Sequence, residues 1–134
     1  MSGARITFAA GISWIQRNPF MWRDDARLLD MLLAAKELSK YTEGVTLEEF
    51  DRNRLLQHAV IRLIGIVGEA ARNISAEFKT AHAEIPWSGI VSMRNRLVHE
   101  YFRVASDKVW EVVKKDIPAL IALIEPLVPP EEPR

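Results

Sequence analysis

The stretch "LLQHAVIRLIGIVGEAARNI", residues 55 to 74, decides the fold. Its apolar residues recur every three or four positions over about five turns, which is the period of an α-helix with one face on a core. The residues on that face are Leu55, Leu56, Ala59, Val60, Leu63, Ile64, Val67, Ala70, Ala71 and Ile74. We therefore expect this segment to be the central helix of the protein.

Two glycines, Gly65 and Gly68, lie inside this helical pattern. Each costs roughly 1 kcal/mol relative to alanine in a helix interior, so a structural reason for them is worth seeking. Close approach of a second helix is one explanation, and simple tolerance of the two residues is the other.

The segments on the N-terminal side of the central helix also have helical signals. Asp24 or Asp25 is a candidate N-cap for a first helix that runs to about Tyr41. Thr46 and Glu49 have the spacing of a capping box, in which a hydroxyl and a carboxylate each accept a backbone hydrogen bond. We expect this box to open a short turn before the central helix.

The segments on the C-terminal side follow the same pattern. The polar residues 79–84 predict a linker, and Pro86 suits the first turn of a helix that begins near Trp87. Ser106 is a candidate cap for a further helix, and Pro118 predicts a kink or restart at about Asp116.

No long segment alternates with period two, so the predicted fold class is all-α, an up-and-down antiparallel bundle of four to five helices. We assign residues 21–128 to one helical domain. Residues 1–20 are interpreted as a loose N-terminal extension rather than a secretory signal, and residues 129–134 as a frayed C-terminal tail.

The composition excludes several classes of site. Lys plus Arg and Asp plus Glu number 18 each, so no overall basic field is present to hold a long nucleic acid. The absence of cysteine excludes disulfides and thiolate ligands and is compatible with the cytoplasm. The three histidines are scattered, so we expect no metal site. The uncharged stretch of residues 6–15 is too short to span a bilayer, so we expect no membrane insertion, and we expect no cofactor.

The octet "RNRLVHEY", residues 94 to 101, carries the chemistry. On a helical wheel Arg94 falls within the arc of Ile90, Leu97 and Val98, so its guanidinium points toward the core. A guanidinium there needs an anionic partner because it cannot lose its proton.

The partner of Arg94 has two possible sources. One is a carboxylate of the same chain, for which Glu69 and Asp30 are the candidates. The other is a bound phosphate, and a histidine within two turns, His99, then suggests phosphodiester chemistry with Asn95 in support. Cleaving RNA without a metal needs both a base and an acid, so a two-fold homodimer would have to supply a second His99.

The octet matches an Arg-x4-His-x-Tyr motif, and the chain resembles the HepT-like toxins of the HEPN superfamily over roughly residues 21–128, including "YTEG", "GEAARNIS" and "IPWSGIVSMRNRLVHEYF". The resemblance implies a dimeric helical bundle with metal-independent endoribonuclease activity at Arg94 and His99. It also implies a minimal nucleotidyltransferase antitoxin that transfers AMP to Tyr101.

Alternatives remain open at this point. Without the resemblance, Tyr101 is most simply an amphipathic residue at the edge of the core. The protein as a whole could be a non-catalytic helical module that binds a nucleotide or another protein. Arg96 is interpreted as a solvated surface residue, or else as part of a basic track for RNA with Arg103, Lys108, Lys114 and Lys115. The sequence leaves open whether the RNA substrate is tRNA or messenger RNA.

Overall fold

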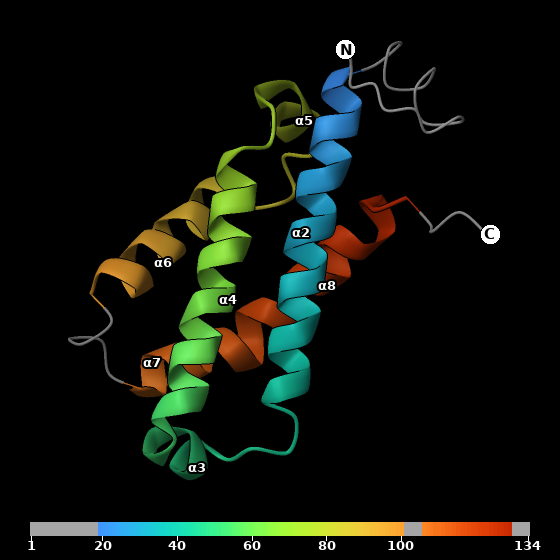
Figure 1. The fold of residues 1–134 in the computed structure, drawn as a ribbon. Helices are drawn as coiled ribbons and strands as arrows, with labels where there is room; N and C mark the ends of the chain where they lie inside the picture. The colour runs from blue at the N-terminus through green and yellow to red at the C-terminus, as the bar shows by residue number, and fades with distance from the viewer. Residues whose placement is uncertain (1–18, 101–105, 130–134) are drawn as a thin grey trace, which may run out of the picture.

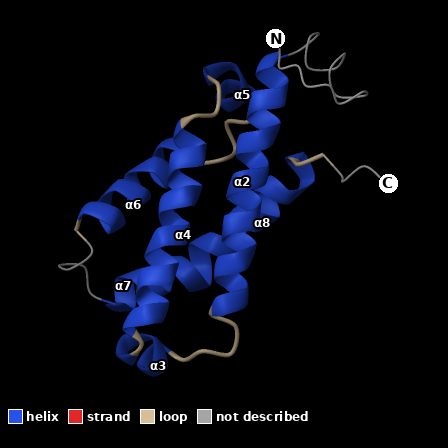
Figure 2. Ribbon diagram, viewed as in Figure 1, coloured by secondary structure: helices blue, strands red, loops and turns tan. Residues whose placement is uncertain are grey.

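The computed structural model describes residues 19–100 and 106–129. The helices of these ranges are α2 (Pro19–Tyr41), α3 (Leu47–Arg52), α4 (Arg54–Arg72), α5 (Ala76–Ala81), α6 (Trp87–His99), α7 (Ser106–Glu111), a π-helical turn (Val112–Asp116), α8 (Ile117–Ile124) and a terminal 3-10 turn (Glu125–Leu127). Within the described ranges there is no strand, and the predicted all-α class is confirmed (Figure 2).

The long helices α2 and α4 lie side by side and run in opposite directions (Figure 1). Helix α6 packs on α4, and α8 packs on α2, so the two long helices form the middle of the bundle. The core between them is built from aliphatic side chains with little or no exposed surface, including Leu28, Met31, Leu38, Val60, Ile64, Val67, Ile117 and Ile124. The predicted antiparallel helical bundle is therefore confirmed.

Helix α4 confirms the central helix expected from residues 55–74, with one exception. Leu55 was expected on the buried face but is 82% exposed. The helical period explains the error, because Leu55 lies about 80° around the helix from the buried Leu63, on the side that carries the exposed Arg62.

The start of the first helix was predicted wrongly. Helix α2 begins at Pro19, so Asp24 and Asp25 lie inside it rather than at its cap. Asp24 is buried, and its carboxylate accepts hydrogen bonds from the backbone N–H of Ser75 at 2.9 Å and from the Ser75 hydroxyl at 2.7 Å. Asp24 therefore does not cap α2, and its carboxylate instead holds Ser75, which lies 51 positions away in the sequence.

The linker predicted for residues 79–84 is partly helical. Ser75 caps the short helix α5 by accepting a hydrogen bond from the N–H of Phe78 at 3.1 Å, and the helix continues to Ala81. The residues after Ser75 lack a long apolar period, so the sequence pattern does not predict this short helix. The capping box of Thr46 and Glu49 is confirmed, and α6 begins at Trp87 as expected.

The C-terminal helices bend where the sequence predicts. Pro118 has no N–H to donate, and the helix in front of it widens into the π-helical turn, in which the N–H of Ile117 bonds to the carbonyl oxygen of Val112. Helix α7 starts at Ser106, whose hydroxyl donates to the Asp51 carboxylate and so ties α7 to α3. In the described ranges no helix has both the length and the apolar character needed to cross a bilayer.

Candidate active site around Arg94

Helix α6 packs closely against α4 at Gly68. A Cβ atom added to Gly68 would lie 2.1 Å from Cβ and 2.3 Å from Cγ of Arg94, distances too short for non-bonded carbon atoms. At Gly65 an added Cβ would meet only Cγ2 of Val98, at an ordinary 3.6 Å. Close approach of a second helix therefore explains Gly68, whereas Gly65 is tolerated in an ordinary contact.

The guanidinium of Arg94 points inward, as the helical wheel predicts, and its side chain is only 23% exposed. Its Nη1 donates a hydrogen bond to Oδ1 of Asn95 at 2.9 Å. Its Nη2 lies 3.7 Å from Oε1 of Glu69, which is too long for a hydrogen bond. Its Nε is buried and has no hydrogen-bond partner in the part of the chain that the structure describes.

Glu69 is therefore the own-chain carboxylate that sequence reasoning proposed for Arg94, but the pairing is loose. The Glu69 side chain is 48% exposed, and its other oxygen lies 3.8 Å from Nη1 of Arg72 and accepts a hydrogen bond from the Asn73 amide at 3.3 Å. A half-exposed carboxylate shared among three neighbours contributes little to holding one cation. Arg94 thus keeps capacity for a further anionic partner.

A cavity of about 430 Å³ opens beside Arg94, between α2, α4 and α6. Glu69 and Asp30, the two candidate carboxylates, both line it. Its remaining lining residues are Arg27, Ile61, Arg62, Gly65, Ile66, Ala70, Asn73 and Val98.

His99 lies outside the cavity beside Arg94. It is the last residue of α6, its side chain is exposed, and it does not line the cavity. Five positions along a helix correspond to about 140° of rotation and about 7.5 Å of rise, so Arg94 and His99 of one chain do not converge on one point. The hydrogen bond from Arg94 holds the Asn95 side chain beside the guanidinium. Tyr101 lies outside the described residues.

The proposed basic track is only partly assembled. Arg96 and Lys108 line one shallow cavity of about 230 Å³, but Lys115 lies 3.6 Å from the Glu111 carboxylate and Lys114 lies over the Trp110 ring at 4.8 Å. Arg103 lies outside the described residues. In the described ranges no group of three or more His, Cys, Asp or Glu side chains could hold a metal ion.

Three cavity residues escaped sequence reasoning: Arg27, Arg62 and Asn73. Arg27 lies on α2, Arg62 lies on α4, and Asn73 caps the C-terminal end of α4. Their proximity therefore depends on the packing of α2 against α4. One signal was available, because Arg62 is the single charged residue between Ala59 and Val67.

Comparison with known proteins identifies the family. The family described as "Ribonuclease HepT-like" matches residues 31–127. A protein of Thermococcus cleftensis named "Probable ribonuclease HepT" is 40% identical over 100 residues, which is 75% of this chain and 91% of the relative. A Methanocaldococcus jannaschii protein named "Putative RNase" is 35% identical over 100 residues, 75% of this chain and 92% of the relative. No solved structure gives a significant match. The chain belongs to the ribonuclease HepT-like family.

Proposed function

We propose that this protein is a metal-independent endoribonuclease that acts as a homodimer and is the toxin of a toxin–antitoxin pair. One observation carries the proposal: Arg94 is embedded between two helices with an unpaired Nε and only a distant, shared carboxylate beside it. An enzyme that stabilises a phosphorane needs such a cation. The names of the relatives as ribonucleases support the substrate class.

In the proposed reaction, the imidazole of one His99 takes the proton from a ribose 2′-hydroxyl. The 2′-oxygen then attacks the neighbouring phosphorus atom, and the bond from phosphorus to the 5′-oxygen breaks. A second, protonated His99 gives its proton to the leaving 5′-oxygen, so the products are a cyclic 2′,3′-phosphate and a free 5′-hydroxyl. Arg94 stabilises the negative charge that accumulates on the phosphorane oxygens.

The dimer follows from the position of His99. Because the exposed His99 of one chain lies around the helix from Arg94, a two-fold partner has to present the second imidazole and its own Arg94 across a shared cleft. We further propose that Asn95 orients the Arg94 guanidinium, to which it is already hydrogen-bonded at 2.9 Å.

Regulation by AMP transfer completes the proposal. A minimal nucleotidyltransferase antitoxin would join the Tyr101 oxygen to the α-phosphorus of ATP and release pyrophosphate. The resulting phosphodiester adds bulk and negative charge two positions after His99, where it opposes entry of an RNA phosphate. A cytoplasmic location fits both an RNA substrate, whether tRNA or messenger RNA, and such a partner.

The proposal is tested by the His99→Ala variant, with His58→Ala as a histidine control on α4. Purified proteins are incubated with total RNA and tRNA in EDTA, and the product ends are analysed for cyclic phosphate. We expect His99→Ala to lose cleavage by about 10²- to 10⁴-fold with fold and dimer intact, whereas His58→Ala cleaves normally. Unchanged cleavage by His99→Ala contradicts the assignment. Binding of RNA or nucleotide without cleavage by the wild type favours a non-catalytic module.

A further inference from the structure

The cavity beside Arg94 contains more positive charge than its own chain neutralises. Three arginines line it, Arg27 on α2, Arg62 on α4 and Arg94 on α6, together with two acidic residues, Asp30 and Glu69. Among the described residues Arg27 and Arg62 take part in no ion pair or hydrogen bond of their side chains, and both are exposed. The cavity therefore offers two guanidinium groups with free donors for an incoming anion.

About half of the lining of the same cavity is apolar. Ile61, Ile66 and Val98 present aliphatic surface from α4 and α6, and the Asn73 side chain adds an amide. A volume of about 430 Å³ suits a small molecule rather than a protein segment or a duplex. Aliphatic walls contact the faces of a flat ring, an amide can bond to its edge, and guanidinium groups hold phosphates.

We propose that this cavity is a subsite for the nucleotide next to the cleaved phosphodiester of a single-stranded RNA, with Arg27 and Arg62 holding its phosphates. The inference rests on the proposed ribonuclease function, because Arg94 at the cavity wall takes the cleaved phosphate. A base reaches the cavity only when it has left its stack, so the subsite selects unpaired RNA. An acidic peptide would match the charges but would leave the aliphatic walls without a flat partner.

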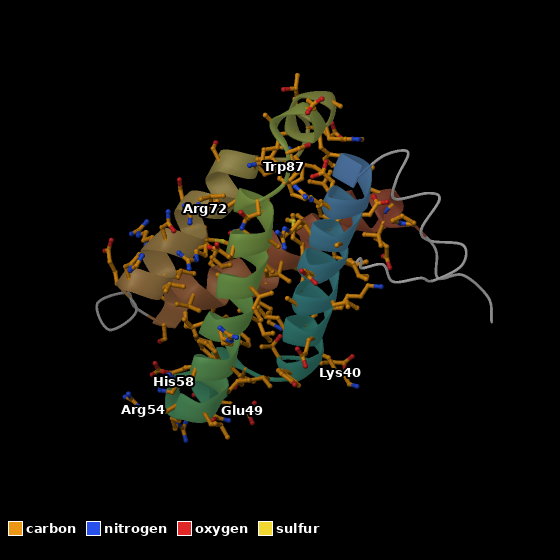
Figure 3. The ribbon with its side chains drawn as sticks, turned by 45° about the horizontal axis from the view of Figure 1, so that its top comes forward. Lys40, Glu49, Arg54, His58, Arg72 and Trp87 are labelled. Carbon is orange, nitrogen blue, oxygen red and sulfur yellow. The ribbon has the colours of Figure 1, made fainter. Side chains whose placement is uncertain are left out.

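The test compares two double variants of the full-length chain in the His99→Ala background, which removes cleavage from the binding measurement. Arg27→Gln/Arg62→Gln removes the two cavity cations. Arg23→Gln/Arg54→Gln makes the same charge change on the same two helices at exposed residues that do not line the cavity. Arg54 lies at the end of α4 opposite Arg72 (Figure 3).

Affinity for a short fluorescent single-stranded RNA is measured by anisotropy at several salt concentrations. We expect the cavity variant to bind about tenfold more weakly, with a salt slope reduced by about 0.7 to 1.4 because one or two phosphate contacts are lost. The control variant stays within about twofold of its parent. With a blunt duplex RNA the two variants are expected to behave alike.

Three results would overturn the subsite. One is an equal loss of affinity in both double variants, which indicates a general charge effect. Another is equal weakening of duplex and single-stranded RNA by the cavity variant. The third is dissociation of the cavity variant into monomers in light scattering, which assigns the arginines to a protein contact. Failure of the ribonuclease proposal is separate, since it appears as absent cleavage in the wild type while the binding difference persists.

Discussion

Two inward-facing polar groups of this protein, the buried Asp24 and the partly exposed Arg94, are treated by the fold in opposite ways. The Asp24 carboxylate receives a backbone N–H and a hydroxyl from Ser75, at 2.9 Å and 2.7 Å. The Arg94 guanidinium has one hydrogen bond to its neighbour Asn95, a carboxylate at 3.7 Å and a buried Nε without a partner in the described residues. The fold satisfies the first group and leaves the second incomplete.

This difference distinguishes a polar group whose hydrogen-bonding capacity the fold satisfies from one that it leaves with unused donors. A buried charge that is fully hydrogen-bonded stabilises the arrangement around it, whereas an unsatisfied donor costs about 1–3 kcal/mol and persists where something else depends on it. Asp24 holds the start of α5 against α2. Arg94, which lines an open cavity, is available to a ligand.

The largest effect on folding is expected at Asp24. Asp24→Ala removes both acceptors of Ser75 and leaves its N–H partly buried without a partner, so we expect a loss of about 3 kcal/mol in the free energy of unfolding. Urea titration followed by circular dichroism measures it. Asp30→Ala, at an exposed residue of the same helix, should remain within about 0.5 kcal/mol of wild type. Equal losses of stability at Asp24 and Asp30 would contradict the claim that the hydrogen bonds of Asp24 stabilise the fold.

The two glycines of α4 test whether the fold places Arg94 by close packing. Gly68→Ala forces α6 away from α4, because the added methyl meets the Cβ of Arg94 at 2.1 Å, and should lower stability by about 1–2 kcal/mol and reduce RNA cleavage. Gly65→Ala meets only a 3.6 Å contact, so the higher helix propensity of alanine should raise stability by about 0.5–1 kcal/mol. The same unfolding titrations check both, and effects of the same sign would contradict the packing geometry.

The smallest effect concerns Glu49, a satisfied anion at the surface. Hydrogen bonds from the backbone N–H and the hydroxyl of Thr46 hold the pKa of Glu49 below its usual value. The stabilisation from its charge is thus present above the ordinary glutamate pKa of about 4.3 and is lost as the pH falls through the lower, folded pKa. We expect wild type to be more stable than Glu49→Gln near neutrality, with the difference vanishing in acid. Glu48→Gln serves as the control, and a difference that is independent of pH would exclude the charge as its source.

Most of the fold was predictable because it depends on local patterns. The period of α4, the capping box at Thr46 and the break near Pro118 are each encoded within a few residues. The errors arose where partners are distant in sequence: Asp24 bonds to Ser75, and Leu55 is exposed because of the side on which neighbouring helices pack.

The features of the candidate site also divide into those that a local sequence pattern predicts and those that depend on helix packing. The inward direction of Arg94 followed from the helical period, and Glu69 was correctly named as its carboxylate neighbour. The loose geometry of that pair and the cavity with Arg27 and Arg62 depend on how α2, α4 and α6 pack together, which no local pattern encodes. The roles of Arg94, His99, Asn95 and Tyr101 stay predictions.

The most direct measurement combines stability and RNA cleavage in Arg94→Met. Methionine keeps the apolar stem against Gly68 and removes both the charge and the unsatisfied Nε. If Arg94 is retained for the substrate, the variant unfolds at an equal or higher urea concentration than wild type while RNA cleavage is lost. A variant that is destabilised by about 2 kcal/mol or more and still cleaves RNA would show instead that the arginine serves the fold.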